Sequence, residues 1–427
     1  MTKGSKAVKT YLPRIADGML ADRLKRKGAV QIKGAKWCGK TETAKQQAKS
    51  VLYLQDPDVY EQNMRAARVK PSLLLRGDEP RLIDEWQIAP QIWDAVRFAV
   101  DQDPEPGRFI LTGSAVTGER PLHSGTGRFA FLTMRPMSLF ESQESSGEVS
   151  LARLFDSSTP IEGVSSQTIE DIAFIASRGG WPASVLIPNR HTALATAQDY
   201  VEAICEEDIS RVDGVSRNPD KARALLRSYA RNIATQASDA TLREDMSPAG
   251  ETLSQPSLSR YLDALTDIFV IEELSAWNPQ LRSKTAVRTS PTRCFVDPSI
   301  GVAALGASPD HLLQDLRTFG LLFETLCIRD VRVYADALGG HVFHYRDKSG
   351  LEADAVIVLD DGRWGLVEVK LGDAYVDEGS KNLRLLADKI DQQAMGSPAF
   401  LAVVTAEGYA YTRDDGVHVV PIGCLKP

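Results

Sequence analysis

The first third of the chain alternates short apolar runs with stretches of helical spacing. The apolar runs predict strands at 29–32, 51–54, 82–83 and 109–111. Residues 41–50 separate two of these runs and predict a helix, and residues 91–100 place apolar side chains at the intervals of one helix face. Strands that alternate with helices predict a mostly parallel sheet, and such sheets bind ligands at the carboxyl ends of their strands.

The pattern changes twice after residue 140. Residues 142–166 are rich in Ser, Glu and Gly, with some apolar interruption, and are expected to include a surface loop, whereas helical spacing prevails from residue 168 to residue 275. After Pro298 the chain is first helical and then strand-rich. Strands are expected at 342–345, 355–358 and 365–371. These shifts predict further structural units behind the first sheet.

A glycine-rich loop follows the first predicted strand. Residues 34–41 read Gly-Ala-Lys-Trp-Cys-Gly-Lys-Thr and match the phosphate-binding pattern GxxxxGK[ST] at every fixed position. Gly34 and Gly39 let backbone N–H groups close around phosphate oxygens, and the start of the next helix adds its dipole. Lys40 can reach the β- and γ-phosphates, and the Thr41 hydroxyl can ligate Mg²⁺. A plain glycine turn is the alternative, but the setting between strand and helix favours a site for ATP and Mg²⁺.

Two acids close the third predicted strand. Asp84 can hold Mg²⁺ through water, and Glu85 beside it can orient or polarise an attacking water. Adjacent acids are often a solvated turn, but the apolar lead-in and the distance behind the phosphate loop favour a role in the site. Ser114 closes the next strand, where it could sense the γ-phosphate or be an ordinary turn serine. Arg128 could stabilise transferred charge, although a surface arginine is the better interpretation.

These motifs together resemble the AAA-type P-loop ATPases of bacteria and archaea that carry an uncharacterised C-terminal domain. The resemblance rests on residues 34–41, on Asp-Glu-Trp-Gln at 84–87 and on Phe-Ile-Leu-Thr-Gly-Ser at 109–114. Arg-Gly-Gly-Trp-Pro at 178–182 resembles the Gly-Gly-x-Pro turn of that family. The chain departs from the family at residues 35–37, which read Ala-Lys-Trp where Pro-Arg-Gln is frequent, and at Glu42, where a second Thr is usual. Neither departure removes a phosphate contact.

A second set of acids lies near the end of the chain. Glu368 and Lys370 stand in an apolar strand, and the two-residue period of a strand puts them on one face. Asp354, which closes the preceding segment, and Glu368 could hold divalent ions that activate water against a phosphodiester. Lys370 would then stabilise charge, and the helical Glu324 would complete the shell. This spacing resembles the PD-(D/E)XK nuclease core, whereas a solvated Glu–Lys strand face is the alternative without chemistry.

The middle of the chain contains a candidate for DNA contact. Residues 255–270, with the hairpin expected behind them, resemble a winged helix-turn-helix. The side chains that could contact DNA phosphates are Arg260, Arg282, Lys284 and Arg288. Such contact would be salt-sensitive and weak by itself. A packing module between the ATPase and C-terminal domains explains the same pattern, and both interpretations stay open.

The charge of the chain is acidic and unevenly distributed. The 427 residues carry 50 basic and 57 acidic side chains, a net charge of −7, so no global basic field draws nucleic acid. Residues 294–427 carry 12 basic and 20 acidic side chains, a net charge of −8, which disfavours a strong independent grip on DNA. Five scattered cysteines without a CxxC pair argue against disulfides and zinc. Because the sequence has no secretory signal or spanning run, we expect a cytoplasmic protein without a membrane partner.

The expected fold is α/β, with four units. They are a P-loop, AAA-type parallel-sheet domain (1–140), a helical lid (141–219), a winged-helix-like module (220–300) and a small α/β, PD-(D/E)XK nuclease-like domain (301–427). The expected function is ATP hydrolysis that couples nucleotide state to the C-terminal domain, with DNA as a candidate substrate. The alternative is a nucleotide-dependent switch whose C-terminal domain binds a protein partner, or a second copy of the chain, and cuts nothing.

Overall fold

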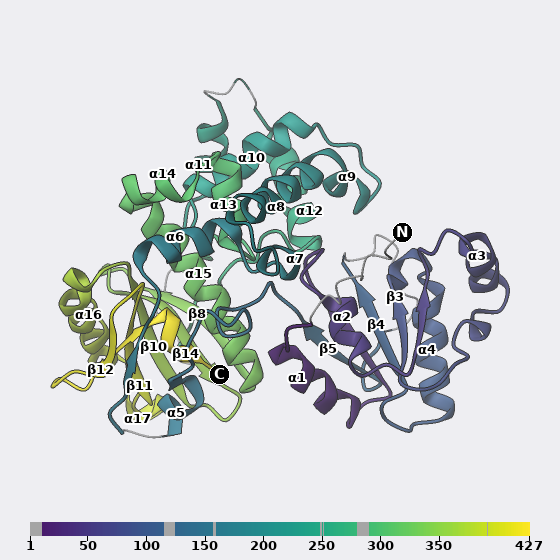
Figure 1. Cartoon of the computed structure of the whole chain (residues 1–427), viewed down its shortest axis with the longest axis horizontal. Helices are drawn as coiled ribbons and strands as arrows, with labels where there is room; N and C mark the ends of the chain where they lie inside the picture. Colours follow the sequence, from purple (N-terminus) through teal and green to yellow (C-terminus); the bar gives the residue numbers. More distant parts are fainter. Residues whose placement is uncertain are drawn as a thin grey trace, which may run out of the picture.

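The described residues form a five-stranded and a seven-stranded sheet, joined through a helical region, and a short two-stranded sheet. The structure is a computed structural model that describes residues 11–114, 124–156, 159–247, 250, 252–279, 290–390 and 392–427. The first sheet and the second lie at opposite sides of the molecule, and the helices of the middle of the chain lie above and between them (Figure 1). Across the described ranges, no helix is both long enough and apolar enough to cross a membrane.

The first sheet has five parallel strands in the order β2-β3-β4-β1-β5. Its strands are β1 (Ala29–Lys33), β2 (Ser50–Tyr53), β3 (Arg81–Asp84), β4 (Phe109–Gly113) and β5 (Phe129–Thr133). Its helices are α1 (Ile15–Leu24), α2 (Lys40–Lys45), α3 (Tyr60–Val69) and α4 (Gln91–Gln102). The predicted parallel sheet is therefore confirmed. The predicted helix at 41–50 is too long, because residue 50 already belongs to β2.

Register brings the ends of three strands to one level. Thr112 near the end of β4 pairs with Ile32 of β1 and with Asp84 of β3. The chain leaves β1 and β3 at this same edge, into the phosphate loop on one side and into Glu85 on the other. The edge of the sheet therefore gathers the residues that the sequence singled out.

Helices follow, as the spacing from residue 168 predicts. They are α6 (Ile169–Arg178), α7 (Pro182–Val185), α8 (Arg190–Ala203), the π-helix η3 (Ile204–Asp208), α9 (Ile209–Arg211), α10 (Pro219–Arg231), α11 (Asp239–Met246), α12 (Gln255–Asp267), α13 (Pro298–Leu305), α14 (Pro309–Gln314) and α15 (Leu316–Ala337). Behind α12, two antiparallel bridges, Ile271 with Phe295 and Leu274 with Thr292, fit the expected hairpin. Arg282, Lys284 and Arg288 lie outside the described residues, so the winged-helix interpretation stays a prediction.

The second sheet has seven strands in the order β7-β12-β13-β11-β10-β9-β8. The strands are β7 (Glu162–Val164), β8 (Gly340–Arg346), β9 (Glu352–Leu359), β10 (Trp364–Lys370), β11 (Phe400–Thr405), β12 (Tyr409–Thr412) and β13 (His418–Pro421), with α16 (Val376–Lys389) and α17 (Gln392–Met395) between β10 and β11. Strand β10 runs antiparallel to β9 and parallel to β11. The three strands expected at 342–371 are confirmed.

Residues 142–166 contain more than the expected surface loop. They also form β6 (Val149–Ser150), α5 (Leu151–Asp156) and β7. β6 pairs with β14 (Leu425–Lys426) and β7 pairs with β12, so backbone hydrogen bonding to the chain's end orders this polar segment. Asp354 does not close a segment before the strand but lies inside β9, where residues 352–353 already pair with β8.

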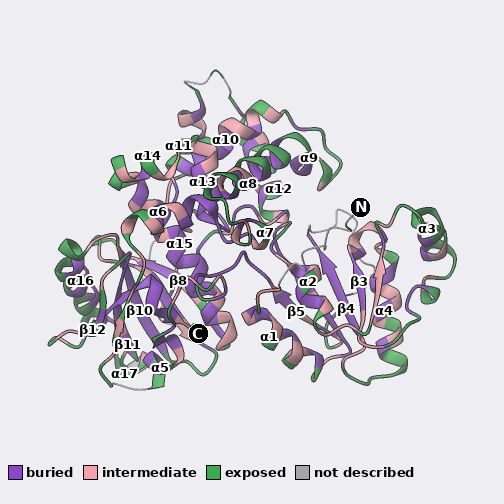
Figure 2. Ribbon diagram, viewed as in Figure 1, coloured by how far each residue is buried: buried purple, intermediate pink, exposed green. Residues whose placement is uncertain are grey.

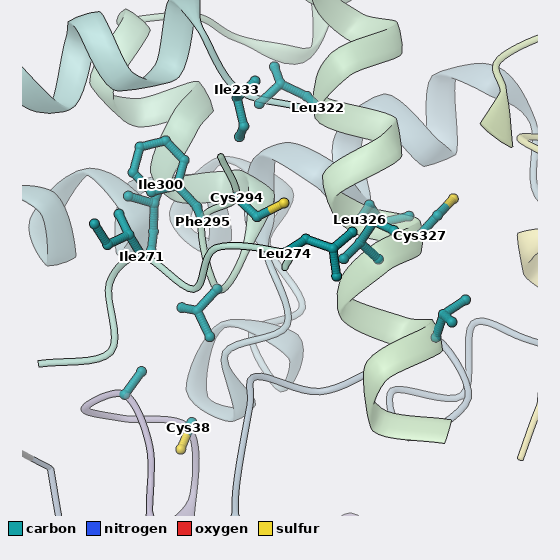
Figure 3. Close-up of a cluster of buried hydrophobic side chains, with 14 of the residues drawn as sticks. Cys38, Ile233, Ile271, Leu274, Cys294, Phe295, Ile300, Leu322, Leu326 and Cys327 are labelled. Carbon is teal, nitrogen blue, oxygen red and sulfur yellow. The ribbon is translucent and has the colours of Figure 1, made fainter. Parts of the chain in front are cut away.

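One hydrophobic core runs from the phosphate loop to the second sheet. A single cluster of buried side chains includes residues of both sheets and of the helices between them, and buried residues occur in all three parts of the ribbon (Figure 2). Cys38 of the phosphate loop, Cys294 and Phe295 of the hairpin, and Leu326 of α15 belong to the same cluster (Figure 3). Helix α15 also packs against both α1 and β8, and so against both sheet-bearing regions. All five cysteines are buried and free, as their scattered positions predict.

Candidate functional site

The phosphate loop adopts a backbone that its glycines permit. Gly34 has φ +148°, and a Cβ atom there would lie 2.0 Å from the Met134 carbonyl oxygen, closer than any side chain allows. Gly39 has φ +102°, directly before α2. Glycine tolerates such positive φ values without the steric cost that other residues incur. Both fixed glycines of the motif are therefore required by conformation and by close packing.

Lys40 lies within the curve of this loop. Its ammonium donates hydrogen bonds to the carbonyl oxygens of Gly34, at 3.0 Å, and Ala35, at 2.7 Å, and the residue is buried. The hydrogen bonds to these two carbonyls use N–H groups of the ammonium that could otherwise donate to phosphate oxygens. Lys40 thus lies inside the loop, with its ammonium bound to two carbonyl oxygens of the loop itself.

Thr41 and Asp84 meet at the edge of the sheet. The Thr41 hydroxyl donates to Asp84 Oδ1 at 2.7 Å, and the Thr112 hydroxyl donates to the same oxygen at 2.6 Å. Gln55 donates from Nε2 to Asp84 Oδ2 at 2.8 Å. Asp84 is buried, and these three donors fix the direction of its carboxylate. Sequence reasoning missed Gln55 and Thr112, whose positions at the ends of β2 and β4 are the only local signal.

Glu85 follows Asp84 in a left-handed backbone conformation, with φ +55°. A non-glycine residue with positive φ is uncommon, and strain of this kind clusters at functional sites. Its carboxylate accepts a hydrogen bond from Ser114 Oγ at 3.2 Å and another from Gln87. Ser114 therefore contacts Glu85, which favours a part in the site over an ordinary turn. Arg128 pairs instead with Asp101 on the surface.

An arginine from outside the motif supports the loop from behind. Arg14, just before α1, donates from Nη1 to the Cys38 carbonyl at 2.7 Å and from Nη2 to the Arg135 carbonyl at 2.9 Å. Its Nε lies 3.0 Å from Glu141 Oε1, and both side chains are almost fully buried. Because Arg14 and Glu141 are 127 positions apart, no local pattern in the sequence could have revealed the pair.

The C-terminal acids occupy a second constellation. Glu368 Oε1 and Lys370 Nζ form an ion pair at 2.8 Å, so the prediction that these residues share a face is confirmed. Asp354 Oδ2 accepts a hydrogen bond from the Val369 N–H at 2.7 Å, which ties β9 to β10 beside Glu368. Glu324 reaches the same neighbourhood from α15, since it interacts electrostatically with both Asp354 and Glu368. The structure thus brings together all four predicted residues.

Burial and crowding of like charge perturb these acids. Burial, followed by the nearby Asp354 carboxylate, raises the pKa of Glu368 to about 8. Burial raises the pKa of Asp354 to about 6, and burial with Asp354 and Glu368 raises the pKa of Glu324 well above its usual range. Burial alone would lower the pKa of Lys370, but its pairing with Glu368 raises it. Protons or a cation are therefore needed to hold these carboxylates together.

One oxygen of this constellation has no protein partner. Glu368 Oε2 is buried and accepts no hydrogen bond, although an uncompensated buried oxygen is costly. Carboxylate oxygens are donors that Mg²⁺ and Mn²⁺ accept. Within the described part of the chain, however, no group of three or more His, Cys, Asp and Glu side chains is arranged to hold a metal ion. The donor chemistry fits a divalent cation, but a complete protein shell is not preformed.

Comparison with known proteins divides the chain into three regions. Residues 26–143 match the family described as an AAA domain, whereas 169–311 and 319–425 match two domain families of unknown function, DUF8612 and DUF4143. Two uncharacterized proteins, Mb2031c of Mycobacterium bovis and Rv2008c of Mycobacterium tuberculosis, are each 25% identical over 418 residues, which cover 96% of this chain and 83% of the relative. Among solved structures, the Walker-type ATPase PABY2304 of Pyrococcus abyssi is similar with a TM-score of 0.43 and 14% identity, over 69% of this chain and 96% of that chain.

The match over residues 26–143 agrees with the geometry of the first sheet domain. The region contains the phosphate loop, Asp84, Glu85 and Ser114, and the five parallel strands that hold them. The two families of unknown function neither support nor exclude a winged helix or a nuclease-like core in the remainder. Residues 26–143 of this chain are therefore similar to AAA domains, in sequence and in the phosphate loop that their parallel sheet carries.

Proposed function

We propose that this chain binds ATP with Mg²⁺ at residues 34–41 and hydrolyses it. The observation that carries the proposal is the hydrogen bond from Thr41 to Asp84, because it joins the phosphate loop to the acid of β3 at one edge of the sheet. The buried ammonium of Lys40 inside the loop supports the same site. The AAA-type domain over 26–143 is the setting in which this arrangement serves nucleotide hydrolysis.

The donors at this edge fit Mg²⁺. The hydroxyl of Thr41 and the carboxylate of Asp84 are hard oxygen donors of the kind that Mg²⁺ prefers, and they already meet at 2.7 Å. When bound, Mg²⁺ neutralises charge on the β- and γ-phosphates. Thr41 and Asp84 would hold the ion, while Gln55 and Thr112 keep the Asp84 carboxylate in direction. Lys40 exchanges its carbonyl contacts for phosphate oxygens.

Glu85 is the residue that handles the attacking water. Its carboxylate stands one position beyond Asp84 and is oriented by Ser114 and Gln87. A carboxylate held beside a bound nucleotide can accept the water's hydrogen bond and orient it for in-line attack on the γ-phosphate. Ser114 and Gln87 position Glu85 and do not touch the reacting atoms in this role.

The test of this function compares two lysines of the same helix. Lys40→Ala is expected to weaken ATP binding about tenfold or more, because it removes a charged hydrogen-bond donor to phosphate. Lys45→Ala is the matched control, since Lys45 pairs with Glu42 outside the loop. Binding is measured by calorimetry and hydrolysis by phosphate release. Unchanged ATP affinity in a folded Lys40→Ala variant, or an inert parent, contradicts the proposal.

A second candidate function belongs to the C-terminal acids. The buried oxygen of Glu368 that lacks a partner favours a divalent cation between Glu368 and Asp354. With such an ion bound, water is activated for attack on a phosphodiester. Lys370 would stabilise the developing charge, and Glu324 would complete the carboxylate set. ATP hydrolysis in the first domain would then control a nuclease-like site that acts on DNA.

The nuclease candidate is separable from its alternative. Nicking of plasmid and of single-stranded DNA is measured with Mg²⁺ or Mn²⁺, with and without ATP. Metal-dependent nicking that Glu368→Gln abolishes supports the nuclease. Asp361→Asn is the control, because Asp361 pairs with Arg363 on the surface and is not one of the proposed metal-holding carboxylates. ATP hydrolysis without any nicking instead supports a nucleotide-dependent switch whose C-terminal domain binds a partner.

A further inference from the structure

The outer side of the phosphate loop is in contact with the helical region. Lys36 Nζ forms an ion pair with Asp208 Oδ1 at 2.5 Å, although the two residues are 172 positions apart. The ring of Trp37 lies 6.0 Å from that of Tyr200 in α8. Two neighbouring elements of the helical region, α8 and η3, therefore meet the loop.

The third contact comes from the Gly-Gly-Trp-Pro turn. A Cβ atom on Gly39 would lie 3.4 Å from Pro182 Cγ, so the proline ring covers the last glycine of the loop. Trp181 of the same turn is buried against Tyr200, with ring centroids 4.3 Å apart, and donates from its indole nitrogen to Ser299. The elements that touch the loop are thus also packed against one another.

The backbone around Asp208 is unusual. Residues 204–208 form a π-helix between α8 and α9, and such segments are rare and concentrate at functional positions. Asp208 ends this segment, and its side chain is 10% exposed, whereas that of Lys36 is 44% exposed. A nearly buried carboxylate therefore sits against a cation of the phosphate loop itself.

The charges of this contact oppose phosphate binding. A nucleoside triphosphate carries several negative charges, and a carboxylate at the rim of its site repels them. Asp208 also neutralises Lys36, which is otherwise a second ammonium on the loop besides Lys40. Removing the carboxylate frees that ammonium and lowers the repulsion. Each of these effects strengthens phosphate binding.

We propose that the helical region is a working part of the nucleotide site, in which Asp208 is a positioning residue that holds Lys36 away from the phosphates of ATP. The inference rests on the proposed ATP site and adds that Asp208 weakens ATP binding there. Tight nucleotide binding breaks the Lys36–Asp208 pair. The position of η3 therefore depends on whether a nucleotide is bound in the loop. Through Tyr200 and Trp181, the same movement reaches the turn at 179–182 and the helices behind it.

The test is the affinity for nucleotides that differ in phosphate number. Asp208→Asn keeps the size of the side chain and is expected to tighten ATP binding about fivefold at low salt, with a smaller effect at high salt. Adenosine, which has no phosphate, is expected to bind both proteins alike. Asp208→Glu restores the charge and is expected to restore the parent affinity. Asp213→Asn is the matched control, because Asp213 pairs with Arg217 and not with the loop.

A double variant identifies the route. In a Lys36→Ala background, Asp208→Asn is expected to tighten ATP binding less than it does in the parent, because loss of the carboxylate still lowers the repulsion of the phosphates but frees no ammonium. An equal gain in both backgrounds overturns the role of Lys36. Unchanged or weaker ATP binding in a folded Asp208→Asn variant contradicts the claim that Asp208 weakens ATP binding, while the proposed function stands. A parent that binds no ATP overturns the proposed function and this inference together.

Discussion

Arg14 and Glu141 form an ion pair that closes the phosphate loop from behind. Arg14 Nε lies 3.0 Å from Glu141 Oε1, and the side chains are 3% and 2% exposed. The same guanidinium donates to the carbonyl of Cys38 in the loop. Glu141 in turn accepts from the backbone N–H groups of Ile15 and Ser138, so every charge of this pair is met by hydrogen bonds. The loop therefore depends on residues at both ends of its domain.

Breaking this pair should destabilise the fold strongly. Arg14→Met keeps the volume of the side chain but leaves the Glu141 carboxylate buried without a cation, and this costs about 3–5 kcal/mol of unfolding free energy. Chemical denaturation followed by circular dichroism measures it. Lys25→Met is the control, because Lys25 and Asp22 form an exposed pair whose loss costs about 0.5 kcal/mol or less. Equal losses in the two variants would contradict the role assigned to Arg14.

Glu85→Gln should separate hydrolysis from binding. The amide keeps the size of the carboxylate but is a poor base, so ATP remains bound while turnover falls about a hundredfold or more. Phosphate release and equilibrium binding are measured on the same preparation. Ser114→Ala, which removes one hydrogen bond to Glu85, should lower turnover less and leave ATP affinity unchanged. Hydrolysis by Glu85→Gln at the parent rate would show that another group handles the water.

Acid should weaken the junction between the first sheet domain and the hairpin. Glu272 pairs bidentately with Arg135, whose charge outweighs burial and holds the pKa of Glu272 at about 2. A depressed carboxylate pKa stabilises the folded state above pH 4.5, and this contribution is lost as the pH falls from 4.5 towards 2. Glu272→Gln should therefore cost about 1–2 kcal/mol at neutral pH, since the side chain keeps part of its surface in solvent.

Melting temperatures between pH 7 and pH 3 test the sign of this effect. The difference between the parent and Glu272→Gln should shrink as the pH falls through the stated range. Glu207→Gln should show no such difference, because Glu207 and Arg211 pair on the surface with exposed side chains. A difference in melting temperature that does not change with pH would mean that the amide disturbs packing and not charge.

Mn²⁺ should raise the melting temperature through the C-terminal acids. A cation that binds only the folded state at about a hundredfold excess over its Kd stabilises it by about 2.7 kcal/mol, which is a rise of several degrees. The measurement uses the Lys40→Ala background without ATP, so that no nucleotide-held Mn²⁺ contributes at the phosphate loop. Asp354→Asn in that background should abolish the rise. Absence of any shift would leave Glu368 paired with Lys370 alone and favour the switch over the nuclease.

The sequence predicted the parts of the site that depend on short spacing. The fixed positions of residues 34–41, the acids at the end of β3 and Ser114 at the end of β4 all lie where the pattern places them. Strand alternation likewise predicted that Glu368 and Lys370 meet. These relationships survive because a turn of helix or two residues of strand determine them locally, whatever packs around them.

The tertiary structure decided the contacts between distant segments. The partners Arg14 with Glu141 and Lys36 with Asp208 are more than 100 positions apart, so only the packing of whole elements brings them together. The same holds for β7, a strand in a polar segment whose backbone finds its hydrogen bonds on β12. By itself, the sequence determined a phosphate loop and the two acids that end β3 beside it, because local backbone geometry suffices for them. The enclosure of that loop by α1 and the helical region was decided by the fold, because long-range burial and charge pairing leave no periodic trace along the chain.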